Sequence, residues 1–149
     1  MSIFTELLIA SAMVTATIAV HLAGLAMLLE VMRQHRRVTS RVNAQVHAVS
    51  GIVIAVYGLF ALHSVEIWSY ALLYYRIGAL PDFEAALYFS TSTYATIGYG
   101  DLVLPKAWRV IGAIEGANGV ILLGWSTAFF VAIVARIRML ESWLAADAP

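Results

Sequence analysis

The sequence contains no cysteine, which excludes disulfide bonds and thiol catalysis. Charged residues are also scarce, at 12% of the chain, whereas a soluble domain typically has about 25%. The nine basic and nine acidic residues cancel, so the charge balance does not indicate nucleic acid as a partner. Hydrophobic residues make up 62% of the 149 residues, and the mean hydropathy is +0.85. We therefore expect one domain embedded in a membrane.

Motifs of several functional classes are missing as well. The sequence has no nucleophile elbow, no P-loop and no HExxH motif, so we do not expect an enzyme. No segment carries arginine at every third position, which excludes a voltage sensor of the usual kind. There is no internal repeat, so any ring-shaped site would need several copies of the chain.

Three apolar segments are long enough to cross a membrane. Leu7–Leu29 and Val42–Val65 contain no charged residue, and Val110–Ala135 contains only Glu115. A helix spans the hydrocarbon with about 20 residues, so each segment is predicted to be a transmembrane helix. The expected organisation is an N-terminal helix over 1–32, a basic link over 33–42, a second helix over 43–75, a third helix over 107–138 and a short tail over 139–149.

Arginine residues predict the orientation of these helices. Most of them lie in the link or at the end of the third helix, namely Arg33, Arg36, Arg37, Arg41, Arg136 and Arg138. Short loops rich in arginine stay on the cytoplasmic side. We therefore expect the N-terminus outside and the C-terminus inside, across the plasma (inner) membrane. All of these arginines except Arg41 are expected to lie near anionic lipid headgroups.

A further apolar segment, between the second and third helices, is too short to cross. Pro81, Asp82 and Glu84 indicate a helix start, because proline suits the first turn and acidic side chains there interact favourably with the helix dipole. The helix, over 83–95, would have about three turns. We expect it to enter the membrane and end there. The predicted fold class is all-α, with three transmembrane helices, a re-entrant helix and a loop over 96–101.

This loop belongs to the most informative pattern in the chain, TYATIGYGD over residues 93–101. Gly98 and Gly100 flank Tyr99 and allow the backbone to alternate between ordinary and left-handed dihedrals. Such alternation turns successive carbonyl oxygens to one side, where they can replace the hydration shell of a cation. The pattern resembles the pore loop of tetrameric potassium channels, and it differs from their TVGYG sequence only by Ile97.

The resemblance is to the bacterial two-transmembrane-pore type of potassium channel, here with an extra N-terminal helix, and it covers about residues 43–138. It implies a homotetramer that conducts K⁺ through a selectivity filter and needs no cofactor. The implied ion-binding residues are Thr96, Ile97, Gly98, Tyr99 and Gly100, with K⁺ at the first four. The residues expected to support the filter are Ser92, Thr93, Asp101 and Glu115.

Other positions agree with the family or depart from it. Gly119 and Gly124 stand where the family's inner helix has a hinge, although close helix packing would also explain glycine there. Many relatives carry tryptophan in the pore helix where this chain has Tyr88 and Phe89. Some relatives hold the filter aspartate with a glutamate at the position of Ser92, so Asp101 is expected to bond differently.

Helical spacing also predicts a gate and a packing face. A pore-facing stripe beginning at Leu123 would continue through Thr127, Phe130 or Val131, and Val134. Four copies of these side chains could close the pore by dewetting. For Phe130 the alternative is contact with lipid. In the N-terminal helix, the packing face is predicted to be the alanine stripe of Ala12, Ala16, Ala19 and Ala23.

Ionisable residues in the apolar segments are functional candidates, and they are His21, His47, His63 and Glu66. His63 and Glu66 are one helical turn apart and can pair, but no set of residues has zinc-site spacing. Two alternatives to a potassium channel stay open. One is a less selective monovalent cation channel on the same scaffold. The other is a membrane redox or scaffold protein with haem between His21 and His63.

Overall fold

Helices are the only regular secondary structure in the part of the chain that the structure describes. Its elements are α1 (Ile3–Val38), α2 (Ala44–Arg76), α3 (Phe83–Tyr94), the single 3₁₀ turn η1 (Lys106–Trp108) and α4 (Arg109–Ala146). The computed structural model describes residues 2–38 and 44–146, with side chains over 2–35 and 46–136. The end of the predicted link, the first residue of the predicted second helix and the end of the predicted tail lie outside the described residues.

The three long helices have the length and composition of membrane spans. Their apolar stretches are Ile3–His35, Val46–Arg76 and Lys106–Arg136. At most 28% of the central part of any span is buried within the chain, so most of its side chains face lipid or other protein chains. This agrees with the all-α membrane fold expected from the sequence.

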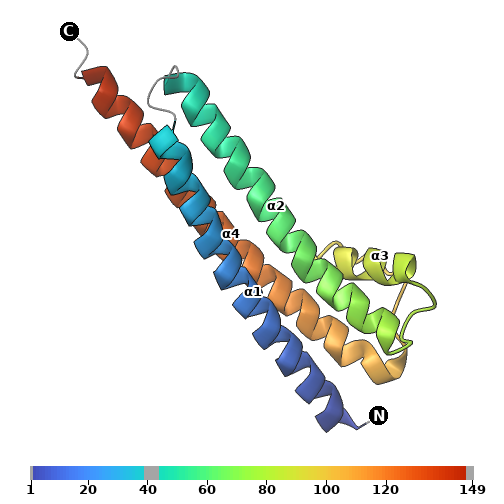
Figure 1. Cartoon of the computed structure of the whole chain (residues 1–149). Coiled ribbons are helices and arrows are strands. Elements are labelled where there is room, and N and C mark those ends of the chain that lie inside the picture. The colour runs from blue at the N-terminus through green and yellow to red at the C-terminus, as the bar shows by residue number, and fades with distance from the viewer. Residues whose placement is uncertain (1, 39–43, 147–149) are drawn as a thin grey trace.

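The long helices lie side by side, each running opposite to the next along the chain (Figure 1). α1 packs against both α2 and α4. The short helix α3 is inclined to the long helices and lies at the end where α1 begins and α2 ends (Figure 1). It packs against α2 and α4, so the loop that follows α3 lies at the N-terminal end of the bundle.

Two glycines allow α1 and α2 to approach closely. An added Cβ on Gly24 would lie 2.4 Å from Cδ1 of Leu62, and one on Gly58 would lie 2.6 Å from Cδ1 of Leu28. Each leucine therefore covers a glycine of the other helix. Association of helices in lipid depends on such van der Waals contact, which small residues permit.

The predicted packing face of α1 is not the face that is buried within one chain. The alanine stripe of residues 12, 16, 19 and 23 is exposed, whereas Thr17 and His21 are buried. Asn118 of α4 donates a hydrogen bond to Thr17 Oγ1 at 2.8 Å. A polar group in apolar surroundings is costly without a partner. The positions of the polar side chains therefore decide which face of α1 is buried.

The largest buried core joins α3 to the long helices. It contains Tyr70 and Tyr74 of α2, Ala86 of α3, Ile111 of α4 and Ala10 of α1. The N-terminus of α3 is capped by Asp82, whose side chain accepts a hydrogen bond from the backbone N–H of Ala85 at 2.8 Å. The cap and the core together hold α3, and hence the loop after it, in one position.

Candidate functional site

The loop after α3 alternates between two backbone conformations. Thr96, Gly98 and Gly100 have φ values of 59°, 58° and 78°, in the left-handed region, and the residues between them do not. Alternation of this kind turns successive carbonyl oxygens toward one side. The loop therefore has the backbone pattern that its glycines were expected to permit.

Thr96 stands out within this loop. It is the one residue other than glycine that has a positive φ in the described ranges. The left-handed conformation costs an L-residue about 1–2 kcal/mol, and threonine is also β-branched. Strained backbone of this kind concentrates at functional sites, so the conformation of Thr96 marks this loop as a candidate site.

The start of the loop is anchored to the last turn of α3. The backbone N–H groups of Ile97 and Gly98 donate to the carbonyl oxygen of Ser92 at 2.8 and 3.1 Å, and that of Thr96 donates to the carbonyl of Thr93 at 3.0 Å. The last carbonyls of a helix have no partner within the helix, and here the loop supplies them. Ser92 and Thr93 thus contact the loop through their main chains.

The far end of the loop is held by Tyr88, which was not among the residues expected to support the loop. The hydroxyl of Tyr88 donates to Asp101 Oδ2 at 2.8 Å, and this bond raises the pKa of Tyr88. The ring of Tyr88 also stacks on Tyr99, with centroids 6.4 Å apart. Asp101 was expected to have a different hydrogen-bond partner from the filter aspartate of related channels, and that partner is Tyr88. In the single chain Ile97 and Tyr99 are 51% and 69% exposed, so the described residues leave the loop largely uncovered.

Glu115 of α4 joins three helices behind the loop. It is fully buried. Tyr74 of α2 donates to its Oε2 at 2.6 Å, and the hydroxyl of Ser90 in α3 lies 2.5 Å from its Oε1. The hydroxyl of Ser90 also lies 2.9 Å from the carbonyl oxygen of Ile67. Glu115 was expected to be a hydrogen-bonded brace, whereas its partners Tyr74 and Ser90 carry no signal in the sequence.

A second buried carboxylate, Glu66 of α2, lies at the C-terminal end of α3. Its Oε1 is 2.8 Å from His21 Nδ1, and its Oε2 is 2.9 Å from His63 Nδ1. Tyr94 also donates a short hydrogen bond to Oε2. The pairing of His63 with Glu66 was anticipated from their spacing. Both imidazoles therefore contact this one carboxylate through their Nδ1 atoms.

The two predicted hinge glycines have different surroundings. An added Cβ on Gly119 would lie 2.3 Å from the carbonyl oxygen of Tyr94, so only glycine allows α4 to approach the end of α3 this closely. A Cβ on Gly124 would have no atom within 4 Å. Close packing therefore explains glycine at position 119 but not at position 124.

The residues of the predicted gate stripe differ in their exposure within one chain. Thr127 and Val131 are exposed, and Leu123 and Val134 are half-buried. Phe130 packs with Phe129 against a cluster of Met32, Ala55 and Ile133 from α1, α2 and α4. This contact turns Phe130 toward the other helices of its own chain and leaves Val131 as the alternative at that level of the stripe.

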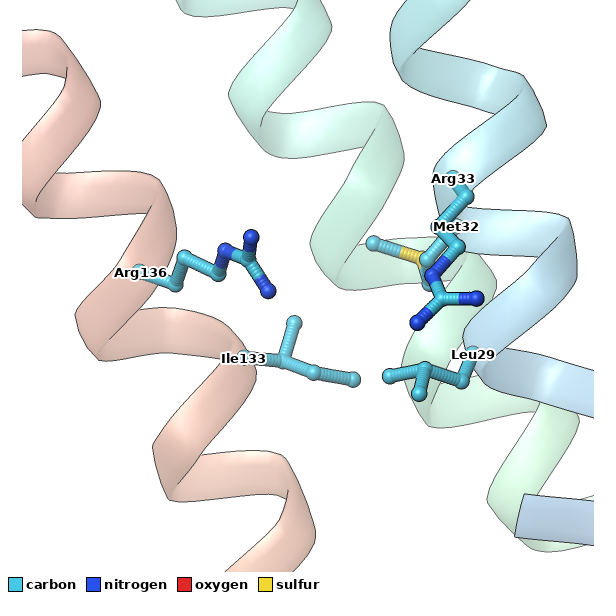
Figure 2. Close-up of a pocket in the computed structure, with 5 residues that line it drawn as sticks. All are labelled: Leu29, Met32, Arg33, Ile133 and Arg136. Carbon is cyan, nitrogen blue, oxygen red and sulfur yellow. The ribbon is translucent and has the colours of Figure 1, made fainter. Parts of the chain in front are cut away.

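Two of the predicted lipid-facing arginines come together at the opposite end of the bundle. Arg33 and Arg136 line a small pocket of about 60 Å³ between α1 and α4, with Leu29, Met32 and Ile133. Figure 2 shows both guanidinium groups directed into the gap between the helices, with Leu29 and Ile133 facing each other beside it. Arg33 also lies 3.6 Å from Glu30. The side chains of Arg36, Arg37 and Arg138 lie outside the described residues.

Fold and site together define an integral membrane protein with three apolar helices and a strained, exposed loop behind which two carboxylates are buried. The family comparison makes this class specific. Residues 60–136, just over half of the chain, match the ion-channel family. The protein belongs to this family, in its potassium-channel pore type, and is therefore a channel rather than an enzyme. The match covers the end of α2, α3 and most of α4, and it leaves out α1. No curated protein and no solved structure matches the chain.

Proposed function

We propose that this protein is a potassium-selective channel, in which four copies of the chain place their 96–101 loops around one axis. The observation that supports this best is the left-handed backbone at Thr96, Gly98 and Gly100 within the sequence TIGYG. The carbonyl oxygens of residues 96–99 and the Thr96 hydroxyl would replace the water around K⁺. The helix α3 would be the re-entrant pore helix, with the negative end of its dipole directed at the ion path.

Assembly from four copies would cover what one chain leaves open. The loop is exposed, and beside it a groove of about 490 Å³ is lined by Phe89, Thr93, Val103, Leu104, Arg109, Gly112 and Ala113. Closed rings are the usual form of symmetric assemblies. In the tetramer, a neighbouring copy would fill this groove and complete the ion path.

The proposed orientation follows from the arginine-rich end of the bundle. Arg33 and Arg136 lie near the ends of α1 and α4 that are opposite α3. We place this end in the cytoplasm, and the loop and the N-terminus outside, across the plasma membrane. The pocket between the two arginines would bind the phosphate of an anionic lipid headgroup, because two guanidinium groups that face one pocket match a phosphate.

The test is ion flux through purified protein in liposomes. Vesicles with an outward K⁺ gradient should lose K⁺, whereas vesicles with an equal Na⁺ gradient should not. Tyr99→Asp should narrow this difference, since it changes the filter without altering the helices. Crosslinking of the same preparation should stop at four chains. Equal K⁺ and Na⁺ flux through the unaltered protein would favour the less selective cation channel, and conduction by monomers or dimers would contradict the tetramer.

A further inference from the structure

Four side chains from three helices meet in a buried cluster, separate from the 96–101 loop. They are His21 of α1, His63 and Glu66 of α2, and Tyr94 of α3. His21 and Glu66 have no exposed surface, and Tyr94 is 1% exposed. One ligand atom from each of the two histidines and from Glu66 lies within 4.8 Å of the others. The cluster is thus compact enough for all three side chains to reach one ion.

We propose that this cluster binds one divalent transition-metal ion of the Zn²⁺ type. The distances from Glu66 to His21 Nδ1 and His63 Nδ1 are 2.8 and 2.9 Å. Two ligands bound to zinc at about 2.0–2.2 Å in a tetrahedral site lie about 3.3–3.6 Å apart. Each histidine nitrogen would therefore move away from Glu66 by about 0.4–0.8 Å to admit the ion.

The ligand types select the class of metal. Imidazole nitrogen suits zinc, copper, nickel and iron, whereas calcium and magnesium take oxygen ligands. The hydroxyl of Tyr94, 3.0 Å from His63 Nδ1, is placed to be a fourth ligand. Two imidazoles, one carboxylate and one phenol oxygen would complete a tetrahedral site.

The surroundings of the cluster resemble the outer shell of a metal site. The second nitrogen of His63, Nε2, lies 2.8 Å from the hydroxyl of Ser126 in α4. Metal-binding histidines usually hold their other ring nitrogen in a hydrogen bond of this kind. An ion would enter the cluster past His63, because its side chain is 13% exposed whereas those of His21 and Glu66 are fully buried.

His21 and Glu66 are fully buried polar side chains. The Nδ1 atom of His21 contacts Glu66 and is the atom that would bind the ion, whereas its Nε2 has no hydrogen-bond partner in the described part of the chain and would stay outside the site. A metal ion would also compensate the charge of Glu66, which is costly to bury alone.

Bound metal would connect α1 to the pore module. Tyr94 is the last residue of α3, and the loop begins two residues later. The ion would therefore tie the N-terminal helix, which the family match leaves out, to the helix end that carries the loop. Metal binding by itself does not depend on the proposed potassium selectivity.

The experiment is a titration of chelator-treated protein, purified without a polyhistidine tag, with Co²⁺. Bound Co²⁺ is seen by its visible absorption, and Zn²⁺ should displace it. We expect one Co²⁺ per chain. Glu66→Gln and His21→Gln should each weaken binding by at least about tenfold, which is the lower loss seen even for outer-shell partners. Zn²⁺ should raise the unfolding temperature of the unaltered protein and not that of Glu66→Gln.

Two control variants make the result specific. His47→Gln alters the other place where two imidazoles meet, the stacked pair of His35 and His47, whose centroids are 4.6 Å apart. Thr17→Val removes a buried hydrogen bond between α1 and α4 without touching the cluster. Both controls should keep the Co²⁺ absorption.

Failure of the unaltered protein to bind Co²⁺, or loss of binding in His47→Gln but not in Glu66→Gln, would overturn the proposal. Elution at the size of the unaltered protein shows that each variant is folded, and since absorption reports binding, the result is independent of conduction.

Discussion

Replacing Gly98 by alanine should abolish potassium conduction while the protein stays folded. Gly98 has a φ of +58°, and an added Cβ would have no atom within 4 Å, so the change brings no clash within the chain. Its cost is conformational, about 1–2 kcal/mol for an L-residue in the left-handed region. Four copies around one axis would together lose about 4–8 kcal/mol. The loop can avoid this loss by rotating the peptide, which removes a carbonyl oxygen from the row that faces the ion.

The matched control for this variant is Gly78→Ala. Gly78 lies in the turn between α2 and α3, has a φ of +66°, and also has no atom within 4 Å of an added Cβ. The two variants therefore carry the same backbone strain at different places. In the liposome assay, Gly78→Ala should keep K⁺ flux and its preference over Na⁺, with a lower unfolding temperature. Unchanged K⁺ flux in Gly98→Ala, or equal loss in both variants, would refute the assignment of the loop as the filter.

Three further predictions concern the helices behind the loop. Gly119→Ala would place a Cβ 2.3 Å from a carbonyl oxygen of α3, so the free energy of unfolding should fall by about 1–3 kcal/mol. The matched control is Gly124→Ala, whose Cβ would have no atom within 4 Å. This variant should unfold at the temperature of the unaltered protein or above it. Glu115→Ala leaves the buried hydroxyl of Tyr74 without its acceptor, whereas Ser90 keeps the carbonyl oxygen of Ile67. This should cost about 1–3 kcal/mol in thermal unfolding, and a smaller loss in Glu115→Gln would support this reason. Leu123→Ser should increase the leak of K⁺ without any stimulus, because a constriction lined by four serine side chains would stay filled with water. A leak equal to that of the unaltered protein would mean that the gate lies elsewhere.

The sequence by itself determined the features that depend on neighbouring residues. Hydropathy is a property of a continuous segment, so the three apolar helices were predicted and are present. Backbone freedom is likewise local, and the glycines of the TIGYG segment predicted the alternation that the loop shows. The family was identified from this same short motif, and the comparison confirms it.

Only the tertiary structure decided which side chains meet. The alanine stripe of α1 has suitable spacing, but Thr17 and His21 need partners on other helices, and these polar groups bring a different face inward. The hydrogen bond between Thr17 and Asn118 joins residues 101 positions apart. Likewise, one end of α3 brings Tyr94 to Glu66. No periodicity within a single helix can predict such pairs, because they depend on how the helices are rotated against one another. Hydrogen bonds between buried polar groups of different helices favour that rotation, because such groups are costly to bury without partners.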